Sequence, residues 1–261
     1  MILKVSVIIP TYNRSSLLLR AIDSVLNQTY FIHEILICDD GSTDDSYNLI
    51  QNYNDNKIKW IECGRNGMPS VPRNIGIRNS TGDWIAFLDS DDIWHPKKIE
   101  EQANCILKNN CFIVSTNAEV IKGTPKNEIY LNIKREKNTF LNLLFKNEIV
   151  CSSVLINKKL LTKTSLFPED LKYKAIEDYA LWLGLSYTYD FYYLEKALVY
   201  YNDDPKISIR TNSENNFFNQ KKLILNHLAD FLILNKVPIK NYYNFLTKIY
   251  KIYFSCKKYV Y

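Results

Sequence analysis

The sequence predicts an α/β protein with a Rossmann-like mixed sheet, mostly parallel, flanked by helices and followed by C-terminal helices. Short β-branched runs alternate with segments of helical period over the first hundred residues, an order typical of a parallel sheet with helices on its faces. The apolar run at 84–88 is short and ends in acids, as a strand buried on both faces does. The 261 residues, 46% of them hydrophobic, are enough for a sizeable core.

The first ninety-five residues predict alternating strands and helices. β-branched and aliphatic residues indicate the strands, and apolar residues spaced three and four apart indicate the helices. Ser42 is placed to N-cap the second helix, and Pro69 or Pro72 to begin the third. In order, the pattern predicts a strand at 3–9, a helix at 15–27, a strand at 34–38, a helix after Ser42, a weaker strand at 57–62, a helix ending near 80 and a strand at 84–88.

The rest of the chain predicts more elements of both kinds. Residues 122–137 are polar and predict a loop or a weak hairpin. The expected order is a helix at 96–109, a strand at 112–121, that polar segment, a short helix at 138–145, a strand at 151–156, a helix at 177–187, a strand at 191–201 and closing helices at 213–234 and 240–258.

Charge and cysteine usage bound the class of protein. The net charge of +5 is mild, but no acidic residue follows Asp230, so the basic excess lies at the C-terminal end. None of the six cysteines forms a C-x-x-C pair, which favours a reducing compartment. The first apolar run stops at Pro10, unlike a signal peptide, and no apolar stretch is long enough to span a membrane. We therefore expect a cytoplasmic protein.

Acidic residues follow two of the buried strands. Asp39 and Asp40 end one strand, and Asp89, Asp91 and Asp92 end another. Parallel strands bring their carboxyl ends to one edge of the sheet, where ligands bind, so residues 10–14 should lie there too. Crowded carboxylates raise one another's pKa unless a cation is present, and Mg²⁺ or Mn²⁺ commonly bridges carboxylates to substrate phosphates. The alternative for 89–92 is an acidic turn capping the next helix.

Phosphate would have to be held without a glycine-rich loop, because the seven glycines include no G-x-G. A cation or metal must then hold it. Arg73 begins a helix on the active edge, where donors point at an anion; a surface arginine is the alternative. The cations available near that edge are Arg14, Arg65, Arg73 and Arg78.

Two further acidic pairs have a functional and a structural interpretation. A carboxylate of Asp39 or Asp40 could accept the imide hydrogen of a uracil, or cap a helix. Tyr12 could stack on that base. Glu177 and Asp178 begin an apolar helix, where acids often offset the helix dipole; alternatively, Asp178 is a general base for an acceptor hydroxyl.

The C-terminal end, residues 236–261, interleaves lysines with tyrosines and phenylalanines. A basic aromatic helix is typical of peripheral membrane contact, and a packing helix with solvated lysines is the alternative. We expect no nucleic-acid partner, because the predicted active edge is acidic and no nucleic-acid motif is present.

Five stretches resemble glycosyltransferase family 2, whose members have the GT-A fold. They are VSVIIPTYNR at 5–14, ILICDDGSTDDS at 35–46, PRNIGI at 72–77, GDWIAFLDSDDIW at 82–94 and IEDYALWLGL at 176–185. The resemblance implies an enzyme that transfers a sugar from a nucleotide diphosphate donor with inversion at the anomeric carbon. It also implies a nucleotide-sugar-binding half at 1–110, an acceptor-binding and catalytic-base half at 111–205 and a helical extension at 206–261.

Carried over position by position, the resemblance assigns roles to the residues above. Asp178 would be the catalytic base and Glu177 would orient the acceptor, with Trp182 on the acceptor side. Asp91 would ligate Mn²⁺ or Mg²⁺. The nucleotide-sugar site would be formed by Pro10, Thr11, Tyr12, Arg14, Asp40, Arg73, Asp89 and Ser90.

Two stretches depart from the family pattern. Gly184 stands where an arginine is common, and 165–169 replaces a glycine-rich approach to the catalytic helix. Both lie on the acceptor side, so the acceptor is the least determined part of the prediction.

The sequence thus predicts a metal-dependent hexosyltransferase that uses a UDP-sugar. Its acceptor would be a growing bacterial surface glycan (lipopolysaccharide, lipooligosaccharide or capsule) that can be lipid-linked, reached at the inner face of the membrane. The alternatives are a nucleotide-sugar-binding module without turnover and a sugar nucleotidyltransferase.

Overall fold

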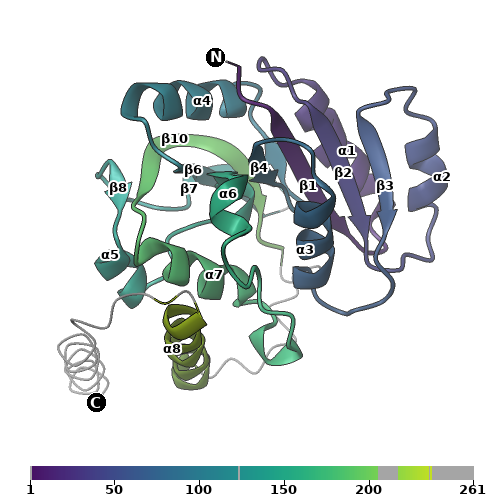
Figure 1. The fold of residues 1–261 in the computed structure, drawn as a ribbon. Helices are drawn as coiled ribbons and strands as arrows, with labels where there is room; N and C mark the ends of the chain where they lie inside the picture. The colour runs from purple at the N-terminus through teal and green to yellow at the C-terminus, as the bar shows by residue number, and fades with distance from the viewer. Residues whose placement is uncertain (1, 123, 205–216, 235, 237–261) are drawn as a thin grey trace.

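A single mixed sheet organises the protein in the computed structural model, which describes residues 2–122, 124–204, 217–234 and 236. The strand order is β3-β2-β1-β4-β9-β6-β10-β5, with β7 paired to β6 and β8 paired to β10 (Figure 1). The parallel ladders contain most of the paired residues, which confirms the predicted mixed, mostly parallel sheet.

The N-terminal half of the sheet is wholly parallel. Its strands are β1 (Val5–Thr11), β2 (Glu34–Asp39), β3 (Ile58–Glu62) and β4 (Trp84–Phe87). The chain runs outward from β1 through β2 to β3 and then returns to the other side of β1 as β4. This reversal between β1 and β4 is a topological switch point, where the loops after the two strands diverge and leave a crevice.

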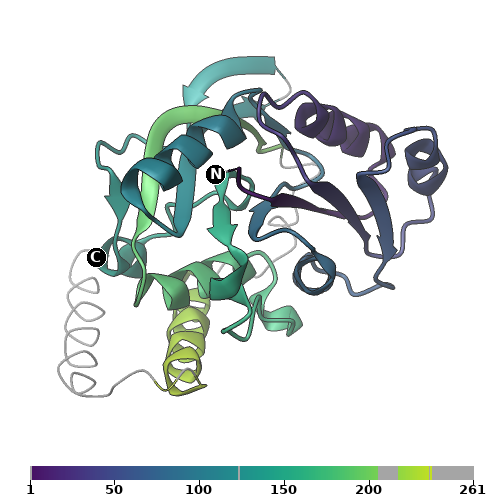
Figure 2. The same ribbon diagram turned by 45° about the horizontal axis from the view of Figure 1, so that its top comes forward.

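Helices cover both faces of the sheet (Figure 2). The helices of the first half are α1 (Ser15–Leu26), α2 (Ser46–Gln51), α3 (Ser70–Asn79) and α4 (Lys98–Asn109). Neighbouring residues of β1 belong to different cores: Val7 and Ile9 pack with α1 and α4, whereas Ile8 packs with α3 and α7. Every residue of β1 is buried, which explains why its sequence is apolar almost throughout.

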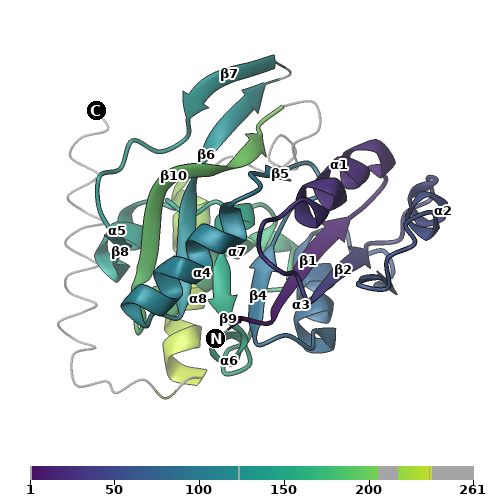
Figure 3. The same cartoon turned by 90° about the horizontal axis from the view of Figure 1, so that it is seen from above.

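The second half continues the sheet with strands of both directions. β9 lies antiparallel between β4 and β6, and β10 is parallel to β6, while β6 and β7 form a hairpin (Figure 3). The elements are β5 (Ile93–Trp94), β6 (Ile113–Lys122), β7 (Thr124–Ile129), β8 (Lys137–Asn138), α5 (Phe140–Phe145), β9 (Leu155–Asn157), α6 (Lys158–Leu161), α7 (Glu177–Ser186), β10 (Phe191–Asn202) and α8 (Phe217–Leu234), with single 3-10 turns at Cys151–Ser153 and Leu171–Tyr173.

The structure corrects two local predictions and decides between the two alternatives of a third. Ser42 does not cap α2, which begins at Ser46 after Asp45; its hydroxyl instead accepts the backbone N–H of Asn13 at 2.9 Å. The predicted strand at 151–156 begins with a 3-10 turn and becomes a strand only at Leu155. The polar segment at 122–137 contains β7, so it is a hairpin and not a loop.

The predicted division of the chain remains a prediction. Both predicted halves share the one sheet, and the boundary at 110 falls at the end of α4. Of the predicted helical extension, the structure describes α8; the helix expected at 240–258 lies outside the described residues. In the described part of the chain, no helix combines the length and apolar character that crossing a membrane needs.

Candidate active site

A cavity of about 520 Å³ opens where β1 and β4 end, within the size range of small-molecule sites. Four segments that the sequence singled out separately meet there: the loops after β1, β2 and β4, and the start of α7. The predicted site residues that line the cavity are Pro10, Thr11, Tyr12, Arg14, Asp40, Arg73, Asp89, Ser90, Asp91, Glu177 and Asp178.

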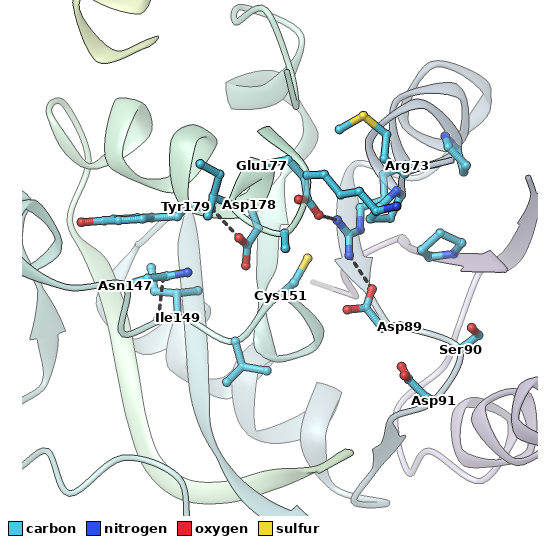
Figure 4. Close-up of a pocket in the computed structure, with 18 of the residues that line it drawn as sticks. Arg73, Asp89, Ser90, Asp91, Asn147, Ile149, Cys151, Glu177, Asp178 and Tyr179 are labelled. Carbon is cyan, nitrogen blue, oxygen red and sulfur yellow. Dashed lines mark hydrogen bonds and ion pairs between the residues drawn. The ribbon is translucent and has the colours of Figure 1, made fainter. Parts of the chain in front are cut away.

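Arg73 joins the two sides of the cavity. Its guanidinium is 3% exposed and contacts Asp89 Oδ1 through Nη2 at 2.6 Å and Glu177 Oε1 through Nη1 at 2.8 Å (Figure 4). Burial alone would lower the pKa of Arg73, but the charges of Asp89 and Glu177 help to raise it well above its usual value. The arginine therefore stays charged, and it fixes a carboxylate from the β4 loop relative to one at the start of α7.

The acidic loop after β4 crowds three carboxyl groups. Asp91 pairs with Arg14 at 2.6 Å. Burial raises the pKa of Asp91, and the charge of Asp89 adds to this, while Arg14 opposes it. Burial, reinforced by Asp91 and Asp89, also raises the pKa of Asp92 well above its usual value. A cation arriving beside Asp91 would relieve this repulsion.

Asp92 holds the loop after β4 in place through hydrogen bonds to other segments. It is buried, accepts the hydroxyl of Ser152, and accepts the backbone N–H of Asn202 at 2.9 Å. The same Ser152 hydroxyl accepts the backbone N–H of Asp89 at 3.0 Å. The turn Cys151–Ser153, which lies within the predicted strand at 151–156, thus sets the position of Asp89.

Asp39, the last residue of β2, and Asp40, which follows it, have different hydrogen-bond partners. Asp39 accepts the N–H groups of Gly41 and Ser42 and so holds its own loop. Asp40 is 5% exposed and accepts the N–H groups of Asn66 at 2.8 Å and Gly67 at 2.9 Å. The alternative that Asp40 caps a helix is therefore wrong.

Arg65 completes this end of the cavity. Its Nη1 pairs with Asp40 Oδ2, and its guanidinium lies 3.7 Å from the centroid of the Tyr12 ring, which is a cation–π contact. The sequence named Arg65 only as one of four available cations. The Thr11 hydroxyl, buried nearby, has no hydrogen-bond partner among the described residues, so it can serve a ligand.

Glu177 and Asp178 begin α7 beside the Arg73 pair. Asp178 is half-buried and its Oδ1 accepts the N–H of Tyr179 at 2.6 Å. Glu177 is 4% exposed, and its Oε2 has no hydrogen-bond partner among the described residues. The preceding Ala175 has φ +68°, a left-handed conformation that is uncommon for alanine. This turn directs both carboxylates toward the cavity, so the start of the helix offers an oriented acid–base group as well as dipole compensation.

The side of the cavity opposite Asp91 has no counterpart in the predicted residues. Figure 4 shows Asn147, Ile149 and Tyr179 there, with Cys151 nearer the centre. Lys146 and Lys174 line the cavity too, and α8 contributes Gln220, Lys221 and Ile224. Apart from Tyr179, which belongs to the stretch at 176–185, these positions carry no motif, and long-range folding alone brings them to the cavity.

Trp182 requires a correction. It is fully buried and does not line the cavity. Its ring packs against Phe87, Phe167 and Phe191 at centroid distances of 5.6 to 5.9 Å. A side chain in this aromatic cluster cannot touch an acceptor, so Trp182 supports α7 from the core side.

The residues at Asp91 suit a metal that is shared with a substrate. Among the described residues, no group of three or more His, Cys, Asp or Glu side chains could hold an ion. Mg²⁺, however, is commonly held by one or two carboxylates together with substrate phosphates and water. Asp91, with its raised pKa and 15% exposed side chain, supplies such a carboxylate. The donor set fits that mode.

The fold, with its crevice at the switch point and its row of acids, is that of a GT-A glycosyltransferase. The chain belongs to glycosyl transferase family 2, whose model matches residues 6–162.

Curated relatives share about two thirds of this chain. It is 37% identical over 182 residues to the UDP-Glc:alpha-D-GlcNAc-diphosphoundecaprenol beta-1,3-glucosyltransferase WfgD of Escherichia coli, a match that covers 69% of each chain. WfaP of the same organism, described with the same activity, is 34% identical over 181 residues, also 69% of each chain. An uncharacterized glycosyltransferase of Rickettsia felis is 38% identical over 186 residues, and there this chain matches only 30% of the relative's length.

Solved structures share the fold at lower identity. S. aureus TarS 1–349 in complex with UDP-GlcNAc superposes with a TM-score of 0.70 at 22% identity, covering 86% of this chain and 66% of TarS. The mannosyltransferase PcManGT of Pyrobaculum calidifontis, in complex with GDP-Man and Mn²⁺, has a TM-score of 0.54 at 18% identity, and the match covers 76% of this chain and 55% of PcManGT.

The described cysteines are free thiols.

Proposed function

We propose that this protein is an inverting, metal-dependent hexosyltransferase that moves a sugar from a UDP-sugar to a hydroxyl of a lipid-linked sugar diphosphate. The acceptor would be an intermediate of a bacterial surface glycan such as lipopolysaccharide, lipooligosaccharide or capsule. The observation that carries the proposal is that Asp40, Asp91 and Asp178, from three separate segments, line one cavity. The printed activities of WfgD and WfaP, which act on GlcNAc-diphosphoundecaprenol, support the acceptor class.

The donor nucleotide would lie along the β1 and β2 loops. Asp40 is the carboxylate that can accept the imide N–H of uracil, and Tyr12 offers a ring face 37% exposed beside it. Pro10 and Thr11 line the same end. The base would lie against Tyr12 where the Arg65 guanidinium now stacks, so Arg65 would shift to its other face or to solvent.

The diphosphate would then reach the acidic loop after β4. Arg14, Ser90 and Asp89 line the cavity there, and Asp91 would share a Mg²⁺ or Mn²⁺ ion with the phosphate oxygens. When bound, such an ion neutralises charge that develops on the departing UDP. The Mn²⁺ and GDP-Man in PcManGT support this use of a metal. Arg73 is already paired to two carboxylates, so its direct contact with the diphosphate remains a prediction.

Asp178 would act as general base. It removes the proton of the acceptor hydroxyl as that oxygen bonds to the anomeric carbon, and the carbon–oxygen bond to UDP breaks with its electron pair leaving on UDP. A single displacement inverts the anomeric centre and needs no covalent sugar–enzyme intermediate. Glu177, held by Arg73, would orient the acceptor through its remaining oxygen.

The place of reaction follows from the acceptor. A polyprenyl-linked sugar stays in the bilayer, so the enzyme would work in the cytoplasm at the inner face of the membrane. Residues 236–261, basic and aromatic, are the segment we propose for peripheral contact; apart from Lys236 they lie outside the described residues.

Two substitutions test the reaction class. Asp178→Asn should reduce kcat by about 10²- to 10⁴-fold, the usual contribution of a general base, while metal-dependent UDP binding persists. Asp91→Asn should weaken both sugar transfer and metal-dependent UDP binding. Transfer is followed with UDP-glucose and a GlcNAc-diphosphate lipid, and binding by calorimetry with UDP and Mn²⁺.

The same measurements separate the alternatives. Full activity of Asp178→Asn would remove the base assignment. Tight UDP binding without transfer to any acceptor would favour a binding module. Release of pyrophosphate from UTP and a sugar phosphate would identify a nucleotidyltransferase, which would want a glycine-rich basic loop after β1 where this chain has PTYNR.

A further inference from the structure

The positive charges in the cavity differ in how they are used. At the end formed by the β1, β2 and β4 loops, each arginine lies against a carboxylate. The pairs are Arg14 with Asp91, Arg65 with Asp40, and Arg73 with both Asp89 and Glu177. Three arginines thus face four carboxylates, so this end has no excess of positive charge before any ligand arrives.

Three lysines also line the cavity, and they are not matched with carboxylates in this way. Lys221, from α8, donates to the carbonyl oxygens of Leu144 and Phe145 at the end of α5 and to the Tyr179 hydroxyl at 2.6 Å. Lys221 is thus committed to holding α5, α7 and α8 together. Lys146 and Lys174 also line the cavity. Their ammonium groups make no hydrogen bond or ion pair with any residue that the structure describes, so their charge is available to a ligand.

Lys146 lies on the side of the proposed base away from the metal loop, and Lys174 precedes that base by four residues along the chain. Lys146 directly precedes Asn147, which lies across the cavity from Asp91, with Asp178 nearer to Asn147 (Figure 4). Lys174 precedes the left-handed Ala175 at the turn into α7. An acceptor sugar whose hydroxyl meets Asp178 has the donor on one side, so the rest of the acceptor extends toward the side that Lys146 lines.

The surface beside Lys146 is apolar. Phe145, at the end of α5, is 52% exposed and lines the cavity, and Leu141, one helical turn earlier, is 58% exposed. Residues four apart on a helix share a face. An anion bound at Lys146 would therefore lie next to an exposed apolar surface, which is the arrangement that a lipid diphosphate requires.

We propose that Lys146 and Lys174 form the subsite for the diphosphate of the lipid-linked acceptor, with the lipid leaving over Phe145 and Leu141. The inference rests on the proposed function, since it assumes an acceptor diphosphate whose sugar is glycosylated at Asp178. It assigns the selection of a charged acceptor over a neutral one to residues outside every motif of the family. Two ammonium groups suit the two phosphates of such an acceptor as point charges.

The test compares two acceptors that differ only in the phosphates: GlcNAc-diphosphate-lipid and the GlcNAc glycoside of the same lipid alcohol. Kinetics are measured for the wild type, Lys146→Ala, Lys174→Ala and the double variant. Each single change should raise KM for the diphosphate acceptor at least about tenfold, the value of one lost charge-assisted hydrogen bond. KM for the UDP-sugar should not follow. The preference for the diphosphate acceptor should collapse in the double variant.

Lys163→Ala is the matched control, because Lys163 is an exposed lysine that does not line the cavity. It should retain the wild-type preference. Calorimetric binding of the diphosphate acceptor in the presence of UDP gives a readout independent of turnover. Transfer by the double variant with unchanged preference would overturn the inference and leave the proposed function standing. Binding that requires both lysines, but with no transfer by the wild type, would support the subsite and refute the reaction.

Discussion

The contact between α7 and α8 offers a sharp test of the architecture. Gly184 of α7 faces the ring of Phe231 from α8, and a Cβ built at Gly184 would lie 2.8 Å from ring atoms Cγ and Cδ2. Those atoms belong to a rigid ring near its backbone, so Gly184→Ala forces the helices apart. Overpacking of this kind costs about 1–3 kcal/mol. Alanine also improves helix propensity by about 1 kcal/mol.

A double-mutant cycle separates these two effects. In the wild type, Gly184→Ala should destabilise the fold by up to about 2 kcal/mol. In a Phe231→Ala background, where the ring is absent, the same substitution should stabilise by about 1 kcal/mol. The coupling free energy of about 1–3 kcal/mol is read from urea unfolding of the four proteins. A coupling near zero would mean that α8 does not pack on Gly184. Since α8 lines the cavity, acceptor KM should also rise in Gly184→Ala.

The remaining predictions concern nucleotide selection and pH. Asp40→Asn should weaken UDP binding about tenfold and relax the preference for uracil, measured by calorimetry with UDP and CDP, because the amide removes an acceptor and leaves Arg65 unpaired. Although burial opposes it, hydrogen bonds from Lys59 and from two hydroxyls lower the pKa of Glu34 to about 2. The folded-state pKa of Glu34 thus lies below its unfolded value of 4.5. Ionised Glu34 therefore stabilises the folded protein above pH ~4.5, and this contribution to the free energy of unfolding is lost as the pH falls toward ~2. Urea unfolding measures how far the free energy of unfolding decreases from pH 7 to pH 3. This decrease should be about 1–2 kcal/mol smaller in Glu34→Gln than in the wild type, after allowance for solvent screening. An equal decrease in the two proteins would contradict the assignment.

Strand-end logic explains why much of the candidate site was predictable. Apolar runs in the sequence indicate buried parallel strands, and the carboxyl ends of such strands lie at one edge of the sheet. Asp40 and Asp91 could therefore be brought together from sequence alone, although more than fifty residues separate them. For Asp178 the residues left two interpretations open, because an acid at the start of a helix is ordinary, and the family resemblance favoured the general base.

What could not be predicted depends on contacts between distant segments. The family resemblance placed Trp182 on the acceptor side, but α7 is apolar all round, so its period does not say which face meets the cavity. Arg65 lay among other cations, and only its approach to Tyr12 and Asp40 selects it. The sequence showed Gly184 only as a departure from the family pattern. The structure explains the glycine, because the Phe231 ring of α8 leaves no room for a Cβ there.

Arg73 links the proposed donor side of the cavity to the proposed acceptor side. It is buried, and one guanidinium nitrogen contacts Asp89 while another contacts Glu177. A donor that draws Asp89 toward metal or ribose would weaken one of these pairs and leave more of the charge of Arg73 to Glu177, the neighbour of Asp178. Losing either partner is costly because the buried charge would remain. The two carboxylates are therefore coupled through Arg73. Occupancy of the proposed donor site should order the start of α7, where the proposed reaction holds the acceptor hydroxyl.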